Sequence, residues 1–187
     1  MPTNNTTGRR ASAPAPIDNM YGHLPPQAIE IEQVVLGALL IDTEAFGLVS
    51  EMLSAETFYD PRHKNIFEAI RTLNMNERPA DILTVTEELR KMGKLDQVGG
   101  MTYVMDLSYM VSSSANVEYH SRILAQKYMA RQLISYASNL ETKAFDETSD
   151  IDELMQNAEG ELFELSRKNM KKDYTQIDPV VKQAYEI

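Results

Sequence analysis

The chain has 187 residues, enough for one domain with appendages, and its 18 Lys and Arg against 28 Asp and Glu give a net charge of −10. This acidic balance argues against a surface built to bind nucleic acid directly. The chain has no cysteine, no apolar run long enough to span a membrane and no secretory signal, so we expect a soluble cytoplasmic protein without disulfides, thiolate chemistry or cysteine-based metal sites.

The first 24 residues are rich in Thr, Asn, Ser, Ala and Pro, which predicts a disordered N-terminal tail. Pro25 and Pro26 end this tail, and Pro26 is expected in the first turn of a helix, where a missing N–H costs nothing. This helix, over residues 28–41, is apolar on nearly all sides and is predicted to be the central buried helix. Gly37 in its middle predicts a close contact with another helix.

Four more helices are predicted between residues 44 and 110, and residues 25–111 are expected to form a globular bundle. Asp60 and Pro61 are predicted to be the cap and first residue of a helix that ends near residue 74. Thr84 and Glu87 have the spacing of a capping box and predict another helix start. No segment alternates apolar and polar residues in the manner of a strand, so we expect no sheet.

Residues 112–168 are predicted to form a long antiparallel helical hairpin, with helices over 117–145 and 151–168. Asp150 is the expected cap of the second helix. The hairpin either folds back on the bundle or projects to bind another chain. Apolar residues outside the main stripes favour projection, because a helix that is apolar beyond one stripe must bury more than one face. The predicted self-association or partner-docking residues are Leu124, Tyr128, Met129, Tyr136 and Phe163.

Residues 169–173 are predicted to be a polar linker, and Asp178-Pro179 starts a last helix that stops at Ile187. A helix cut off in mid-pattern predicts that the protein continues beyond residue 187. The expected fold is therefore all-α: an orthogonal multi-helix globular bundle, a long antiparallel helical hairpin and the start of a linker helix.

The sequence contains no recognisable catalytic, cofactor or metal site. His23, His63 and His120 lie far apart, and no phosphate loop, dinucleotide fingerprint or nucleophile elbow is present. The main interpretation is a helical interaction module. Two alternatives stay open: a stand-alone helical adaptor, and an enzyme whose site is assembled from scattered residues such as Asp60, His63 and Glu87.

The order of several motifs resembles the N-terminal part of bacterial replicative DNA helicases of the DnaB family. The likeness extends from about residue 24 to residue 187. It rests on PQAIEIEQVVLGALL at 26–40, FYDPRHKNIF at 58–67, TVTEEL at 84–89, the Gly99-Gly100 turn with Tyr103, and the 119–133 helix with Arg131.

The resemblance implies an N-terminal domain that assembles as dimers within a ring collar and recruits primase, while loader proteins act on the hexameric ring. It also implies that the ATPase motor, with its ATP, Mg²⁺ and DNA contacts, lies beyond this chain, so that the chain itself holds no catalytic residue or cofactor. The linker helix would dock on a neighbouring subunit's motor domain, through the apolar residues Val180, Val181, Ala184 and Tyr185. The implied location is the bacterial cytoplasm.

Overall fold

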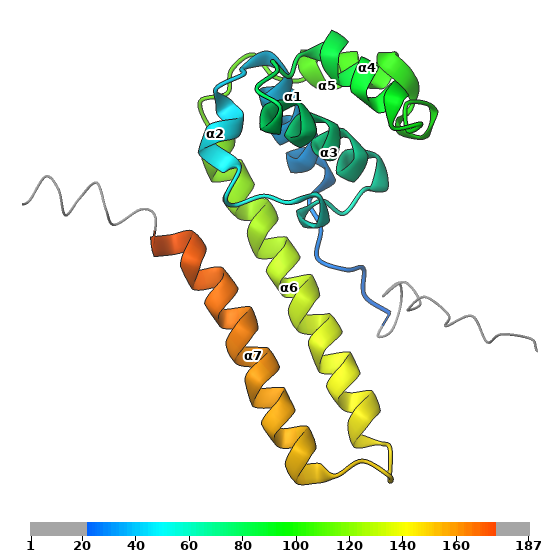
Figure 1. The fold of residues 1–187 in the computed structure, drawn as a ribbon, viewed down its shortest axis with the longest axis vertical. Helices are drawn as coiled ribbons and strands as arrows, with labels where there is room; N and C mark the ends of the chain where they lie inside the picture. The colour runs from blue at the N-terminus through cyan, green and yellow to red at the C-terminus, as the bar shows by residue number, and fades with distance from the viewer. Residues whose placement is uncertain (1–21, 175–187) are drawn as a thin grey trace, which may run out of the picture.

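The structure is a computed structural model that describes residues 22–174, and side chains as far as residue 167. This part of the chain contains seven α-helices, two short 3-10 helices and no strand, so the predicted all-α class is confirmed. Figure 1 shows a compact head and a long helical hairpin that projects from it. The elements are α1 (Ile29–Ile41), α2 (Ala45–Val49), η1 (Ala55–Thr57), α3 (Pro61–Met75), α4 (Ile82–Lys91), η2 (Asp96–Val98), α5 (Gly100–Tyr109), α6 (Val117–Ala144) and α7 (Ile151–Tyr174).

Helix α1 lies at the centre of the head, as its all-round apolar sequence predicts. It packs against α3, α5 and the first half of α6, and nearly every residue from Val35 to Leu40 is shielded from solvent. A Cβ atom at Gly37 would overlap the backbone carbonyl of Leu107 on α5. The absence of a side chain therefore allows the close helix–helix contact predicted for this glycine.

The predicted start of α3 is confirmed, whereas the predicted starts of α1 and α4 are wrong. Asp60 caps α3 by accepting the N–H of Arg62, and Pro61 is the first helical residue. Helix α1 begins three residues after Pro26, whose carbonyl oxygen accepts a side-chain hydrogen bond instead of joining the helix.

Helix α4 is capped by Asp81, not by Thr84. The Asp81 carboxylate accepts the N–H groups of Leu83 and Thr84, and the Thr84 hydroxyl accepts the N–H of Asp81 in return. Thr84 thus completes a capping box as its third helical residue, because a better acceptor lies three positions earlier.

The hairpin forms as predicted and projects from the head (Figure 1). Asp150 caps α7 by accepting the N–H groups of Asp152 and Glu153. Helix α7 continues to Tyr174, so the linker predicted from residue 169 is wrong up to that point. No proline or glycine interrupts residues 169–174, and polar residues alone do not end an exposed helix.

Two predicted segments lie largely or wholly outside the described residues. They are the N-terminal tail, apart from residues 22–24, and the linker helix with Val180, Val181, Ala184 and Tyr185. None of the helices within residues 22–174 is both long and apolar enough to cross a membrane.

Candidate interaction surface on the helical hairpin

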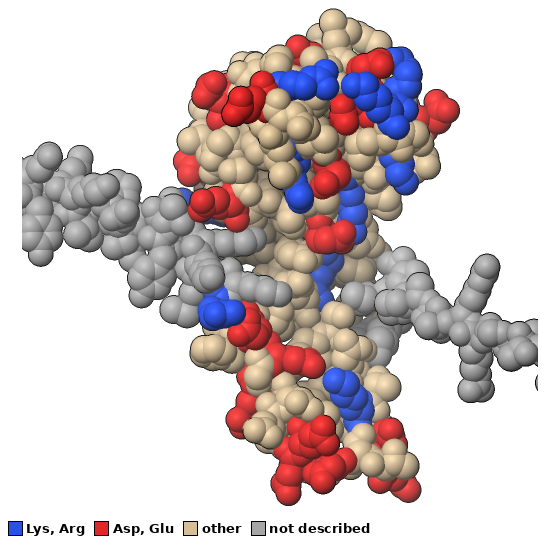
Figure 2. All heavy atoms as spheres, viewed as in Figure 1, with Lys and Arg blue, Asp and Glu red and all other residues tan. Residues whose placement is uncertain are grey.

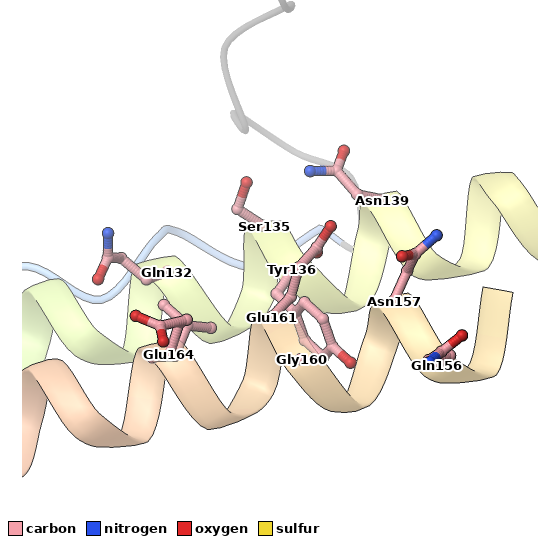
Figure 3. Close-up of a pocket in the computed structure, with 10 residues that line it drawn as sticks. Gln132, Ser135, Tyr136, Asn139, Gln156, Asn157, Gly160, Glu161 and Glu164 are labelled. Atoms are coloured by element: carbon pink, nitrogen blue, oxygen red, sulfur yellow. The ribbon is translucent and has the colours of Figure 1, made fainter. Parts of the chain in front are cut away.

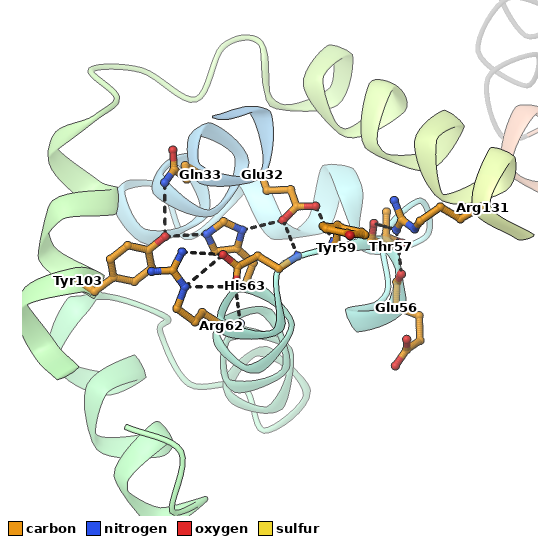
Figure 4. Close-up of polar contacts among 10 residues, drawn as sticks. Glu32, Gln33, Glu56, Thr57, Tyr59, Arg62, His63, Tyr103 and Arg131 are labelled. Carbon is orange, nitrogen blue, oxygen red and sulfur yellow. Dashed lines mark hydrogen bonds and ion pairs between the residues drawn. The ribbon is translucent and has the colours of Figure 1, made fainter. Parts of the chain in front are cut away.

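Arg131, halfway along α6, joins the hairpin to the head. One terminal nitrogen of its guanidinium donates to the carbonyl of Pro26 at 2.8 Å. The other donates to the carbonyls of Thr57 and Glu56 at 2.7 and 3.3 Å. Figure 4 shows Arg131 beside Thr57 and Glu56 on its right. A single side chain thus ties α6, η1 and the segment that leads into α1.

Aromatic rings flank the same guanidinium. The ring centres of Tyr59 and Tyr128 lie 5.7 and 5.5 Å from the central guanidinium carbon (Cζ) of Arg131, within range of a cation–π interaction. Burial lowers the pKa of Arg131, and the nearby carboxylate of Glu32 opposes that effect. Because a planar, delocalised cation suits both rings and carbonyls, lysine could not reproduce these contacts.

A buried polar network lies next to this joint. The Glu32 carboxylate, 1% exposed, accepts the N–H of Tyr59 at 2.5 Å, the N–H of Asp60 at 3.2 Å and Nδ1–H of His63 at 2.6 Å. The second ring nitrogen of His63 then accepts the hydroxyl hydrogen of Tyr103 at 2.8 Å. Figure 4 shows this chain of contacts linking α1, α3 and α5. It fixes the loop that carries Tyr59 and Thr57 toward Arg131.

This network was not predicted from the sequence, where His63 was considered only for a catalytic or metal site. A signal was present, since Glu32 is an ionisable residue inside a helix predicted to be buried on nearly all sides. Such a carboxylate needs buried hydrogen-bond donors. Its partner His63 is 31 positions away, and nothing local in the sequence identifies it.

The predicted docking residues have different surroundings in the structure. Leu124 is 1% exposed and belongs to the core of the head, so its side chain is unavailable to a partner. Tyr128 contacts Arg131, and the Tyr136 hydroxyl donates to the carbonyl of Ala158 across the hairpin at 2.8 Å. Met129 is half-buried. Phe163 alone among the five is largely open, with 66% of its surface exposed.

Helix α7 carries further apolar side chains along the stripe that its helical period defines. Ile151, Met155 and Leu162 are all exposed, whereas Leu154 and Leu165 are half-buried against α6. The difference arises because α6 is the main neighbour of α7, and one helix covers only a narrow stripe of another. An apolar face of α7 is therefore left open.

A groove of about 610 Å³ runs between the two helices of the hairpin. Figure 3 shows Tyr136 between the helices and amide side chains along the rims. The residues from α6 are Gln132, Ser135, Tyr136 and Asn139, and those from α7 are Gln156, Asn157, Gly160, Glu161, Glu164 and Leu165. A Cβ atom at Gly160 would meet no atom within 4 Å, so this glycine keeps the groove open.

Charge is distributed unevenly over the molecule. Figure 2 shows acidic side chains gathered near the hairpin tip, whereas the head carries both signs. Between Arg131 and Arg167 the sequence has nine carboxylates and three cations, a net charge of −6. Such a surface favours a partner with a basic patch.

The residues of the enzyme alternative are engaged separately. His63 bonds Glu32 and Tyr103 in the core, and Glu87 pairs with Arg90 at the surface of α4. Burial opposes ionisation of Asp60, but the hydrogen bonds from Arg62 hold its pKa below the usual range, far from that of a general base at neutral pH. Among residues 22–167, no cluster of His, Asp and Glu could hold a metal ion. This arrangement gives no support to a catalytic site.

Residues 24–126 match the family model described as the DnaB-like helicase N terminal domain. The chain is 44% identical over 182 residues to the replicative DNA helicase DnaB of Rhodothermus marinus, covering 97% of the chain and 19% of that protein. It is 33% identical to the replicative DNA helicase DnaC of Bacillus subtilis, covering 90% of the chain and 37% of that protein. The chain thus spans well under half the length of these relatives.

Two solved structures share the fold. One is the crystal structure of the N-terminal domain of DnaB helicase from Mycobacterium tuberculosis, with a TM-score of 0.71 and 34% identity over 75% of this chain and 99% of that chain. The other is described as the structure of a DnaB-like replicative helicase and its interactions with primase, with a TM-score of 0.62 and 26% identity over 75% of this chain and 31% of that chain.

Proposed function

The chain belongs to the DnaB-like helicase N terminal domain family, and we propose that it is the assembly and primase-docking domain of a bacterial replicative helicase. The whole protein would unwind DNA in the cytoplasm by hydrolysing ATP with Mg²⁺, in a motor domain outside these 187 residues. The domain described above would be non-catalytic. Its own partners would be further copies of itself, primase and a helicase loader.

The open apolar face of α7 is the single observation that carries this proposal. Ile151, Met155 and Leu162 on one stripe of α7, and Phe163 about 100° around the helix from Leu162, are 47–66% exposed on a hairpin that projects from the head. Exposed apolar side chains gathered on one projecting element are typical of a protein-binding surface. An assembled collar would bury this face, which the chain alone leaves in water.

Primase is proposed as the second partner on two grounds. The solved DnaB-like helicase with 26% identity is described together with its primase interactions. In addition, the acidic hairpin suits a basic partner surface. Val180, Val181, Ala184 and Tyr185 remain the proposed contacts of the linker helix with a neighbouring motor domain.

The test measures the mass of the 187-residue chain in solution over a range of concentrations, alone and with the C-terminal domain of the cognate primase. Phe163→Glu is the perturbing variant. Reburying about two-thirds of a phenylalanine is worth about 1–2 kcal/mol, so self-association or primase binding should weaken by roughly 5–30-fold. Tyr136 is less suitable, because its bond to Ala158 holds the hairpin together.

Ser166→Glu is the matched control. Ser166 is also exposed on α7, and its replacement adds the same charge without removing an apolar side chain. It should leave both interactions nearly unchanged. A chain that stays monomeric at high concentration and forms no primase complex would contradict the proposal. Equal effects of the two variants would show that charge, not the apolar face, governs binding.

A further inference from the structure

The direction in which the hairpin leaves the head depends on the joint at Arg131. Leu124 is the residue of α6 nearest the tip that belongs to the buried core of the head, and Arg131 lies about two turns further along. Its guanidinium donates to the carbonyls of Pro26, Glu56 and Thr57. Beyond this joint, α6 carries the hairpin away from the head (Figure 1). The positions of these three carbonyls therefore set the direction of the hairpin.

Tyr59 belongs both to this joint and to the buried network. Its ring centre lies 5.7 Å from Cζ of Arg131, and its backbone N–H donates to the Glu32 carboxylate at 2.5 Å. Phe58 beside it is fully buried, and its ring packs on an aromatic ring of α3. A closely packed side chain leaves the backbone around it little freedom. The turn that carries the Thr57 carbonyl is therefore held at both ends, by Glu32 and by Arg131.

The buried network reaches α5 through a single hydroxyl group. Glu32 accepts Nδ1–H of His63 at 2.6 Å, and Nε2 of His63 accepts the hydroxyl hydrogen of Tyr103 at 2.8 Å. The guanidinium of Arg62 lies 4.5 Å from the ring centre of Tyr103 and steadies that ring. Figure 4 shows the whole path from Tyr103 on one side to Arg131 on the other.

Burial makes this path stiff. His63 and Glu32 are 0% and 1% exposed, so water does not replace a contact that opens between them. A buried polar group that loses its partner costs more than a concerted movement that keeps every hydrogen bond made. The members of the path therefore move together.

We propose that the direction of the hairpin is coupled to the position of α5 through this path, with Tyr103 as the positioning residue at the α5 end. A displacement of α5 moves the Tyr103 hydroxyl, and His63 and Glu32 follow it. Because Glu32 holds the backbone N–H of Tyr59, the carbonyls that bind Arg131 move as well. Coupling of this kind needs a contiguous set of contacts between the two sites, and the path supplies one.

Helix α5 is open to contacts from outside the head. Met101 near its start and Tyr109 at its end are 38% and 75% exposed. Any contact that displaces α5 would turn the hairpin. This regulation goes beyond the proposed function, since it takes place within one chain and is independent of what the hairpin binds.

Distance measurements by pulsed electron paramagnetic resonance test this coupling in the 187-residue chain. The chain has no native cysteine. Arg71→Cys on the exposed face of α3 and Glu147→Cys at the hairpin tip therefore each take one nitroxide. An excess of unlabelled chain restricts the measured distances to pairs within one molecule.

Tyr103→Phe removes the hydroxyl and keeps the ring. It should shift or broaden the distance distribution by about 3–5 Å, the displacement that a rotation of about 10–15° gives over an arm of about 20 Å. Arg131→Lys weakens the joint itself and should have at least as large an effect. The double variant should shift no further than Arg131→Lys alone, because both substitutions act on one path.

Val104→Ala is the matched control. Val104 is the neighbour of Tyr103 on α5 and is fully buried, but its side chain takes no part in the hydrogen-bonded path. The variant should lower stability to urea and leave the distance distribution unchanged, which separates positioning from stability. A native distribution in Tyr103→Phe, or an equal shift in Val104→Ala, would overturn the proposal. Additive shifts in the double variant would also overturn it, because Tyr103 and Arg131 would then act on the hairpin independently.

Discussion

Replacing Glu32 by alanine removes the acceptor on which the buried network depends. Three donors, the N–H groups of Tyr59 and Asp60 and the Nδ1–H of His63, would lose their partner at a site that is 1% exposed. Each buried donor left unsatisfied costs about 1–3 kcal/mol, so three of them set the scale of the loss. These costs overlap, because water can enter the space that the side chain leaves. We therefore expect Glu32→Ala to lower the free energy of unfolding by about 3–5 kcal/mol.

The assay is urea unfolding followed by far-ultraviolet circular dichroism, with the free energy extrapolated to water. A loss of this size should also lower the Tm by about 10–15 °C in a chain of this length. Glu32→Gln should fall between Glu32→Ala and the native chain, because it keeps one acceptor oxygen but turns an amide toward backbone donors.

Glu87→Ala is the matched control. Glu87 pairs with Arg90 on the exposed face of α4, so its loss should cost less than about 1 kcal/mol. A loss below about 1 kcal/mol for Glu32→Ala, or one equal to that of Glu87→Ala, would refute the reasoning. The buried network would then contribute little to the stability of the fold.

Three further predictions concern glycines and one surface carboxylate. Gly37→Ala should lower the free energy of unfolding, measured by urea unfolding, by about 1–3 kcal/mol, because the new Cβ has no room against α5. Gly47→Ala in α2 is the control: its Cβ meets open space, so the same measurement should find it neutral or stabilising. Gly160→Ala should stabilise the chain by up to about 1 kcal/mol, since it raises helix propensity without a clash, and a measured loss would contradict the open groove. The hydrogen bond from Ser114 holds the pKa of Asp42 below its ordinary value. The ionised Asp42 therefore stabilises the fold at pH values above its ordinary pKa, and this stabilisation is lost as the pH falls through the lowered pKa. Ser114→Ala should move the pKa of Asp42 up toward 3.8 in a carboxyl NMR titration, and an unchanged pKa would show that the Ser114 contact does not form.

The sequence predicted best the features that depend on neighbouring residues. Asp60 and Pro61 start α3, and Asp150 starts α7, because a cap acts on N–H groups two or three positions away. The hairpin was also predictable, because its two apolar periods flank one acidic turn. The cap of α4 was misplaced since Asp81 and Thr84 both suit the role, and only the backbone geometry chooses between them.

Features that join distant segments were beyond local patterns. The Glu32–His63 pair and the contact of Arg131 with Pro26 bridge 31 and 105 positions. The periodicity of α7 predicted which residues share a face, but not whether that face has a neighbour. Ile151 and Met155 have the spacing of core residues and are nonetheless open, because helical period reports amphipathicity and not burial.

Helix α6 continues without a break from the core of the head to the tip of the hairpin. A small rotation of this helix at the head therefore produces a larger displacement at the tip. The 13 residues from Arg131 to Ala144 extend about 20 Å beyond the joint. A rotation of about 15° at the Arg131 joint would therefore move the tip by about 5 Å, enough to slide one helix past another by roughly one turn. Since the pivot is a set of hydrogen bonds to backbone carbonyls of the head, any partner that shifts η1 or the segment before α1 would change where the far end of the arm points. The geometry of the arm is thus set by contacts made some 20 Å from its tip.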